Sequence, residues 1–282
     1  MTTSGAQGLV VSRATLDDWA VVAAWAGEEG WNPGLSDAPC FFAQDPDGFF
    51  IGRIDGEPVS SVSVVTYDAD YAFLGFYLVR PDQRGRGYGL TTWKTALAHA
   101  EGRTVGLDGV VAQQDNYRQS GFEFAYRTFR YTGTAPWAEM PADVRPVEDP
   151  RTVAAYDSAC CAADRPRFLE RWLTTEGHRA LARVVDGRLT GYGVIRPGRD
   201  ALRVGPLFAD TAADARALLA GLAAEAAGRV FAVDIPEENT AAVALAEEYG
   251  LTPSFETARM YTGPIRPYAH DRVFGVTTLE LG

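Results

Sequence analysis

Residues 73–100, FLGFYLVRPDQRGRGYGLTTWKTALAHA, contain the pattern around which the rest of the chain is organised. The apolar run 73–79 predicts a buried strand, which Pro81 ends because proline has no N–H for a strand ladder. A glycine-rich turn follows, and apolar residues then recur at helical spacing from Leu90 to Leu97. A strand, a glycine-rich turn and a helix in this order point free backbone N–H groups at an anion.

Three kinds of phosphate-binding loop have similar glycine patterns. A nucleotide P-loop needs G-x-x-x-x-G-K-[ST], and the stretch has no such lysine. The third glycine of a dinucleotide fingerprint would fall on Leu90, although Asp108 lies near the distance of a ribose-binding acid. The third pattern, R-x-x-G-x-G, is met by Arg84, Gly87 and Gly89. An ordinary surface turn before a helix is the structural alternative.

The bulk composition limits the classes of protein that the chain can belong to. Its 282 residues suffice for one large or two ordinary domains, and its formal net charge of −11 disfavours nucleic acid as a partner. No apolar stretch reaches the roughly 20 residues that span a bilayer. The N-terminus lacks a signal peptide, so we expect a cytoplasmic protein that does not bind a membrane. Cys40, Cys160 and Cys161 lack metal-ligand spacing, so we expect reduced thiols and no metal.

Periodicity and turn residues predict alternating strands and helices in the first half. Thr15 and Asp18 have the spacing of a capping box, Asp55-Gly56 is a hairpin signal, and Asp37 is expected to cap a short helix. The predicted strands are 9–13, 49–54, 58–67, 73–79, 104–111 and 122–131, with a helix at 113–120 before the last of them.

The second half repeats this order of elements. Residues 132–150 contain four prolines and predict a linker. Thereafter we expect helices at 151–163, 166–175, 210–227 and 239–249, the third beginning at Asp210 or Thr211 and the fourth capped by Asn239. Strands are expected at 180–185, 189–195, 202–205, 230–235, 255–262 and 273–279. The predicted organisation is a domain at 1–135, a linker at 136–150 and a second domain at 151–282.

The first half resembles the GNAT superfamily of N-acyltransferases over nearly its full length. Besides R-x-x-G-x-G it carries the Y-x-x-x-G-F signature at 117–122. The second half resembles the GNAT-like companion domain found behind some GNATs, on residues 205–209, 234–236 and 258–263. The resemblance implies two GNAT-like domains in tandem, of the α/β (α+β) class with mixed, mostly antiparallel sheets. The second half has no R-x-x-G-x-G, so we expect one acyl-CoA site, in the first domain.

The resemblance also implies that acetyl-CoA, or another acyl-CoA, is the cosubstrate. The end of the strand 73–79 would pair with the pantetheine through its backbone, and the following loop and helix start would hold the pyrophosphate. The residues expected to bind the cosubstrate are Leu78, Val79, Arg84, Gly85, Arg86, Gly87, Tyr88, Gly89, Leu90 and Thr91.

The same resemblance suggests catalytic residues. Tyr117 stands where GNAT enzymes often keep a tyrosine that protonates the CoA thiolate, and packing under the following glycine is the alternative. Seven residues earlier, where the family often has Asn, this chain has Val110. The strand 73–79 has no acid, so the general base is open. Asp108 is the predicted base, and the alternatives are a chain of waters or one of Glu28, Glu29, Asp234 and Glu237.

The acceptor pocket of a GNAT enzyme would form near residues 31–42. Trp31, Asn32, Phe41 and Phe42 are the predicted acceptor-binding residues, with core packing as the alternative for the two phenylalanines. The predicted function is acyl transfer to the primary amine of a small molecule or amino acid, by a monomer or homodimer. The alternatives are a transferase of the same fold that uses aminoacyl-tRNA, and an acyl-CoA sensor without catalysis.

Overall fold

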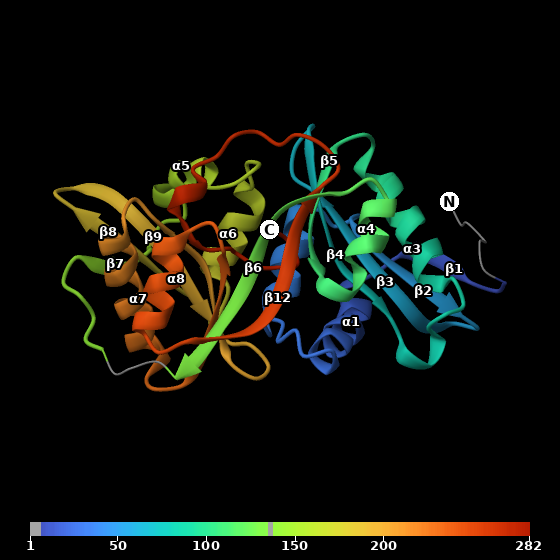
Figure 1. The fold of residues 1–282 in the computed structure, drawn as a ribbon, viewed down its shortest axis with the longest axis horizontal. Helices are drawn as coiled ribbons and strands as arrows, with labels where there is room; N and C mark the ends of the chain where they lie inside the picture. The colour runs from blue at the N-terminus through green and yellow to red at the C-terminus, as the bar shows by residue number, and fades with distance from the viewer. Residues whose placement is uncertain (1–6, 135–137) are drawn as a thin grey trace.

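One sheet of 13 strands crosses the whole molecule in the computed structural model, which describes residues 7–134 and 138–282 (Figure 1). The strand order is β1-β2-β3-β4-β5-β12-β6-β11-β10-β9-β8-β7, and β13 pairs with β10. Most neighbouring strands are antiparallel, whereas β4 with β5 and β10 with β11 are parallel. The fold is therefore mixed α/β with a mostly antiparallel sheet, as the sequence predicted.

The first half contains six strands and four α-helices within residues 7–134. They are β1 (Val10–Arg13), α1 (Leu16–Glu28), α2 (Asp37–Gln44), β2 (Phe49–Ile54), β3 (Glu57–Thr66), β4 (Tyr71–Val79), α3 (Tyr88–Leu97), β5 (Thr104–Val110), α4 (Gln114–Gln119) and β6 (Glu123–Thr134).

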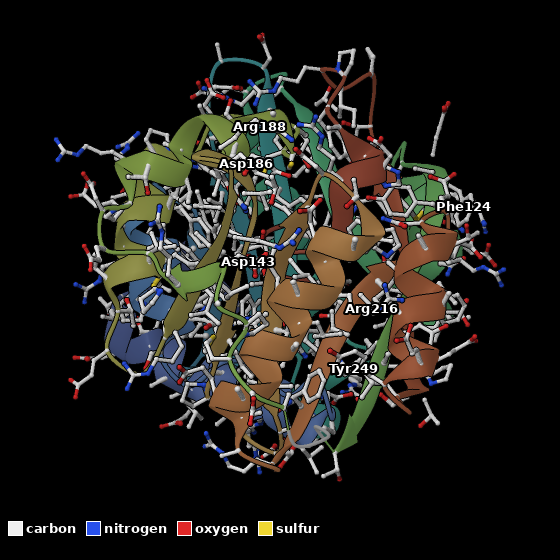
Figure 2. The ribbon with its side chains drawn as sticks, turned by 90° about the vertical axis from the view of Figure 1, so that its left-hand side faces the viewer. Phe124, Asp143, Asp186, Arg188, Arg216 and Tyr249 are labelled. Atoms are coloured by element: carbon white, nitrogen blue, oxygen red, sulfur yellow. The ribbon has the colours of Figure 1, made fainter. Side chains whose placement is uncertain are left out.

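The second half repeats the order of helices and strands within residues 138–282. Its elements are β7 (Val144–Pro146), α5 (Arg151–Ala159), α6 (Pro166–Thr174), β8 (Arg179–Val185), β9 (Arg188–Arg196), β10 (Leu202–Ala209), α7 (Ala212–Ala226), β11 (Val230–Pro236), α8 (Thr240–Glu248), β12 (Thr252–Tyr261) and β13 (Val273–Gly275). Figure 2 shows α7 and α8 on the outer side of this half, where the Tyr249 hydroxyl donates to the backbone carbonyl of Arg216.

Each half gives its last long strand to the sheet of the other half. β6 pairs with β11 along its length, and β12 lies between β5 and β6 (Figure 1). The strands of the two halves therefore cross the predicted domain boundary. Within the predicted linker, β7 pairs with β8, and Val144 of β7 is buried in the core of the second half. The division at residues 136–150 stays a prediction.

Several local expectations are confirmed by the structure. The capping box of Thr15 and Asp18 is present, and side chains of Thr211 and Asn239 cap α7 and α8. Asp37 differs from its predicted role. It is the first residue of α2 and does not cap it; its carboxylate forms a buried pair with Arg196 of β9, with N–O distances of 2.8 and 3.0 Å. The helix start is therefore tied to the second half instead.

One apolar core contains side chains of both halves. Phe41 of α2 stacks on Phe168 and Trp172 of α6, with ring centroids 6.3 Å apart in both pairs. Phe42 stacks on Phe49 at 3.9 Å. These contacts belong to one cluster of buried side chains that contains residues of both halves. The junction is therefore part of the core, and we expect it to be rigid.

His178 makes this junction sensitive to acid. Its Nδ1 lies 2.9 Å from the carbonyl of Trp172, and Nε2 has no hydrogen-bond partner among the described residues. Burial first, and then the nearby Arg196, lower the pKa of His178 from 6.5 to about 4. Protonation of His178 is therefore less favourable in the folded protein than in the unfolded chain. The contribution of this group to the free energy of unfolding is complete above about pH 6.5 and is lost as the pH falls toward 4.

We expect the free energy of unfolding to decrease by about 2 kcal/mol between pH 7 and pH 5 through this group alone. Urea unfolding of the wild type and of a His178→Asn variant at both pH values measures it. The variant keeps a donor near the Trp172 carbonyl but has no group that titrates in this range. Equal pH dependence in the two proteins would show that His178 is not responsible.

Candidate functional site

The central strands β4 and β5 separate at the middle of the first half. They pair from Tyr71↔Thr104 to Leu74↔Leu107, and the pairing stops there although β4 continues to Val79. Phe76 has a positive φ of 48°, which disturbs the regular strand just beyond this point. The peptide groups at the end of β4 therefore have a free edge on the side of β5, which a ligand can pair with.

The glycine-rich loop lies at the end of this free edge. Gly85 and Gly87 have φ values of 78° and 80°, which favour glycine, and Gly87 is the N-cap of α3. Gly89 is needed for a different reason, because a Cβ atom there would lie 2.7 Å from a methyl group of Val79. The first N–H groups of α3 have no acceptor within the helix and point toward the loop. This geometry suits an anion.

The arginines of the loop differ in their contacts. The Arg84 side chain donates to the carbonyl of Val79 at 3.0 Å and pairs with Glu29, the C-cap residue of α1. Arg80 is engaged with Asp82 at 2.7 Å. No hydrogen bond or ion pair to Arg86 is seen in residues 7–134 and 138–282, so its guanidinium is available to a phosphate.

The loop and the free strand edge border a cleft of about 490 Å³. Most of the predicted cosubstrate residues lie along it, whereas Arg86 and Thr91 are not among its lining residues. The Thr91 hydroxyl donates to the carbonyl of Gly87 at 3.2 Å and so belongs to the helix start. The residues that line the cleft are Glu29, Trp31, Tyr77, Leu78, Val79, Gln83, Arg84, Gly85, Gly87, Tyr88, Gly89, Leu90, Val110, Ala112 and Gln113.

A second, smaller cavity adjoins the cleft, and we call it the junction pocket. It has a volume of about 60 Å³ and shares Trp31, Tyr77, Val110 and Gln113 with the cleft. Both halves of the chain contribute to it, because β6, β12 and the segment after β13 lie against the split between β4 and β5. Its other lining residues are Leu74, Gly75, Phe76, Leu107, Asp108, Tyr117, Arg130, Phe255, Thr257, Leu279 and Glu280.

Tyr117 is a lining residue of the junction pocket. Its ring stacks on Trp93 with centroids 5.5 Å apart and covers Gly109, where a Cβ atom would lie 2.4 Å from the ring. Burial raises the pKa of Tyr117 well above its usual value, so its hydroxyl is protonated and able to donate. Tyr77 of β4 lines both cavities, and burial raises its pKa too. Sequence reasoning did not select Tyr77, which reads there as a strand aromatic.

Asp108 faces the junction pocket but is engaged in an ion pair. Both of its carboxylate oxygens accept from the Arg259 guanidinium of β12, at 2.9 and 2.8 Å. Burial raises the pKa of Asp108, and the charge of Arg259 opposes this. A carboxylate with both oxygens occupied has little capacity to take a proton from a substrate. The pair fixes β12 on β5, which favours a positioning role over the predicted role of general base.

The other predicted bases lie elsewhere or are paired. Asp234 forms buried pairs with Arg130 and Arg203, and Glu237 pairs with Arg127 on the surface. Glu29 pairs with Arg84 at the edge of the cleft. Glu28 is exposed and lines neither the cleft nor the junction pocket.

Of the four predicted acceptor-binding residues, the structure brings only Trp31 to the site. Asn32 is buried, and its side chain holds a turn of the second half through the backbone of Asp200 and Ala201. Phe41 and Phe42 lie in the core described above. The amide of Asn32 therefore stabilises a loop contact, and the two aromatic rings have the packing role that was the alternative.

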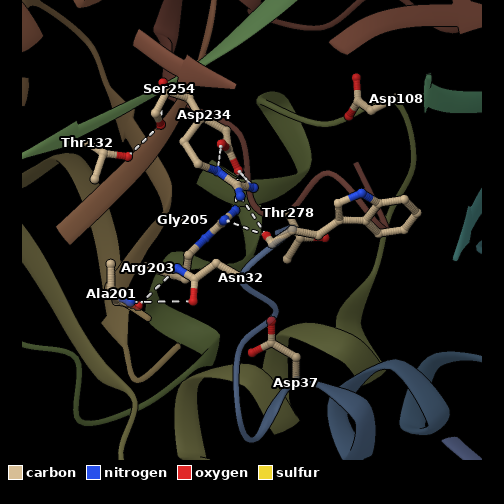
Figure 3. A network of polar contacts seen from close by, with 12 residues as sticks. Asn32, Asp37, Asp108, Thr132, Ala201, Arg203, Gly205, Asp234, Ser254 and Thr278 are labelled. Atoms are coloured by element: carbon tan, nitrogen blue, oxygen red, sulfur yellow. Dashed lines mark hydrogen bonds and ion pairs between the residues drawn. The ribbon is translucent and has the colours of Figure 1, made fainter. Parts of the chain in front are cut away.

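Two arginine side chains hold Trp31 in place through its backbone carbonyl. Arg130 of β6 donates to the Trp31 carbonyl at 2.6 Å, and Arg203 of β10 donates at 3.4 Å. Asp234 of β11 pairs with both arginines. Figure 3 shows Asp234, Arg203 and Asn32 together at this junction. The wall of the junction pocket formed by Trp31 is thus positioned by three strands that belong to the second half's sheet.

The corresponding place in the second half is filled by the chain itself. β10 pairs with β11 only from Leu202↔Phe231 to Val204↔Val233, and β13 then pairs with β10. A Cβ atom at Gly205 would lie 2.3 Å from the carbonyl of Thr277. The start of α7 is capped by Thr211 and has no glycine loop. These contacts leave no room for a ligand where the first half has its cleft.

The comparisons with known proteins define the class. The profile of the acetyltransferase (GNAT) family matches residues 16–122, and that of an acetyltransferase (GNAT) domain matches residues 153–275. The chain belongs to the GNAT family of acyltransferases and contains two such domains in tandem. Members of this family generally use an acyl-CoA as cosubstrate.

One relative that matches nearly the whole chain is named as an acyltransferase. The chain is 34% identical over 273 residues to holothin acyltransferase of Pseudoalteromonas sp. (strain SANK 73390), which covers 95% of this chain and 93% of the relative. It is also 21% identical over 262 residues, 91% of this chain and 92% of the relative, to an uncharacterised N-acetyltransferase of Bacillus subtilis (strain 168).

Solved structures share the fold. A protein of Pyrococcus horikoshii assigned as an acetyltransferase has a TM-score of 0.85 at 24% identity and covers 99% of this chain and 98% of its own. A tandem GNAT protein from the clavulanic acid biosynthesis pathway has a TM-score of 0.63 at 18% identity, covering 91% and 99%. In the described part of this chain, no helix is long and apolar enough to span a membrane, and no group of three or more potential metal ligands is found.

Proposed function

We propose that this protein transfers an acyl group from acetyl-CoA, or another acyl-CoA, to the primary amine of a small molecule. One observation carries the proposal: an anion-binding loop and a free strand edge share one cleft, which continues into a separate pocket beside Trp31. Such an arrangement lets an elongated anionic cosubstrate and a small acceptor meet at the end of β4. The site residues and the acceptor class belong to this proposal.

Each part of the site has a chemical task in this reaction. The N–H groups at the start of α3 and the guanidinium of Arg86 bind the pyrophosphate. A backbone N–H at Leu78 or Val79 polarises the thioester carbonyl. The protonated hydroxyl of Tyr117 donates to the departing thiolate, and Tyr77 is placed to do the same.

The raised pKa values of the three cysteine thiols support direct transfer of the acyl group in a ternary complex. Burial raises the pKa of Cys40 to about 11 and that of Cys160 to about 12, and it raises the pKa of Cys161 well above its usual value. A thiol nucleophile needs a lowered pKa to carry an acyl group itself. None of these thiols lines the cleft or the junction pocket.

The relationship to holothin acyltransferase supports a small-molecule acceptor and makes holothin the first one to test. We further propose that the protein acts in the cytoplasm as a monomer or homodimer. Transfer from aminoacyl-tRNA is disfavoured by the net charge of −11, because phosphate backbones reward basic surfaces. An acyl-CoA sensor without catalysis remains the second candidate, since it needs only the cleft.

Two measurements on the purified protein test the proposal. We expect acetyl-CoA at about 100 times its Kd to stabilise the fold by about 2.7 kcal/mol, seen as a rise in Tm. We also expect free thiol to be released when holothin or a simple primary amine is added with acetyl-CoA. Stabilisation without thiol release across a panel of amines would favour the sensor. Absence of stabilisation would contradict the proposal as a whole.

A further inference from the structure

The segment after β13 brings a carboxylate to the junction pocket. Residues 276–282 are largely buried between the two halves, and the end of the chain lies there in Figure 1. A Cβ atom at Gly75 would lie 2.3 Å from the carbonyl of Glu280. This segment therefore packs against β4 one residue beyond its last pair with β5. Glu280 lines the pocket and is 6% exposed.

Glu280 differs from the other acids around the pocket in having no bound partner. In residues 7–134 and 138–282, no hydrogen bond or ion pair to its carboxylate is seen, whereas Asp108 and Asp234 are both paired with arginines. Thr257 of β12 lines the same pocket, is 1% exposed, and its hydroxyl has no hydrogen-bond partner among the described residues. Two unsatisfied polar side chains thus occur in one small pocket, which points to a polar ligand there.

The charges around Glu280 come from four packed elements. Arg203 of β10 and Arg130 of β6 favour its charged form, while Asp37 of α2 and Asp234 of β11 oppose it. Burial outweighs these charges and raises the pKa of Glu280 above its usual 4.5. A carboxylate with a raised pKa accepts a proton more readily than an ordinary one.

We propose that Glu280 is the general base of the transfer and that the acceptor nitrogen binds in the junction pocket between Glu280 and Thr257. This inference depends on the function proposed above and adds the base that the first half lacks. As the new C–N bond forms, the nitrogen gives one proton to Glu280. As the C–S bond breaks, the sulfur takes one proton from Tyr117. Solvent returns the proton of Glu280 to Tyr117, so the amide and the free thiol of CoA are the only products.

The lining also indicates the class of acceptor. Apart from Glu280, Thr257, Gln113 and the ion-paired Asp108 and Arg130, the pocket is formed by apolar and aromatic residues such as Trp31, Phe76 and Phe255. A primary amine on a compact apolar or aromatic body fits this lining. An amine that carries a second charge would leave that charge without a partner.

A Glu280→Gln variant tests the role, because it keeps the shape of the side chain and removes the base. With acetyl-CoA and either holothin or phenethylamine, we expect kcat/KM to fall at least about 100-fold. The acid limb of the kcat profile, which reports the base in the enzyme–substrate complex of the wild type, should disappear. The Kd for acetyl-CoA should stay within about twofold of the wild type. Glu247→Gln is the matched control, since Glu247 is exposed on α8 and lines neither the cleft nor the junction pocket.

The outcomes separate this inference from the proposed function. If the wild type turns over and the Glu280→Gln variant has the same kcat/KM, the base assignment is wrong and the proposed function stands. A wild type that fails to bind acetyl-CoA overturns both. If the variant does not fold, as judged by circular dichroism, Glu280→Asp replaces it. The Glu280→Asp variant keeps a carboxylate, so its kcat should be lower but should still decrease at acidic pH. Loss of this decrease would contradict the assignment.

Discussion

An Asp234→Ala variant should lose about 3–5 kcal/mol of stability, the cost of leaving buried charges without a partner. The carboxylate of Asp234 pairs with Arg130 at 2.8 Å and also with Arg203, whose side chains are 5% and 2% exposed. Removing it leaves two cations next to each other in the core. Because both arginines also donate to the Trp31 carbonyl, we expect Trp31 to become less fixed in the wall of the junction pocket as well.

Urea unfolding at pH 7 measures this effect. The matched control is Glu248→Ala, which removes an ion pair between Glu248 and Arg216 on the surface of the second half, where the side chains are 52% and 50% exposed. We expect that control to change stability far less, because solvent screens an ion pair on the surface. Similar losses in the two variants would mean that the buried pairs contribute no more than a surface pair.

A Gly87→Val variant should lose at least about 100-fold in acetyl-CoA affinity, the second large effect we expect. Gly87 has a φ of 80°, and open space surrounds the position where its Cβ would stand. We expect a side chain there to obstruct the N–H groups of α3 that we propose bind the pyrophosphate, and about 3 kcal/mol of binding corresponds to such a loss. Calorimetric titration with acetyl-CoA gives the Kd of each protein.

Gly56→Val is the control for backbone strain in this experiment. Gly56 has a φ of 85°, is equally unhindered, and lies in the hairpin between β2 and β3, outside the cleft. Both substitutions should cost about 1–2 kcal/mol of stability, since each forces a side chain into the left-handed region. Only the loop variant should lose affinity. An equal loss in both variants would show that affinity follows stability and not the loop.

Local signals in the sequence predicted the elements well because their causes lie within a few residues. The R-x-x-G-x-G loop, the Asp55-Gly56 hairpin and the caps at Thr211 and Asn239 depend on backbone conformations and on hydrogen bonds to nearby residues. Such causes leave a pattern that can be read along the chain.

The contacts between the halves left no such pattern. Asp108 and Arg259 are 151 residues apart in sequence, and only the position of β12 beside β5 makes them a pair. Glu280 lies in a tail without regular structure, which reaches the site by packing against Gly75. Asn32 was expected to bind the acceptor because it lies in the segment 31–42, whereas its amide contacts residues of a distant turn. Side-chain roles that depend on contacts between distant parts of the chain can be assigned only from the three-dimensional structure.

The interchange of β6 and β12 also determines when this enzyme becomes complete during synthesis. The first half leaves the ribosome with its glycine-rich loop but without the strand that lies beside β5, since β12 is translated long after β5. A nascent chain that terminates early therefore lacks both that strand and Glu280. We expect unfinished translation products to be catalytically silent, so that cells gain activity only from chains translated through residue 280.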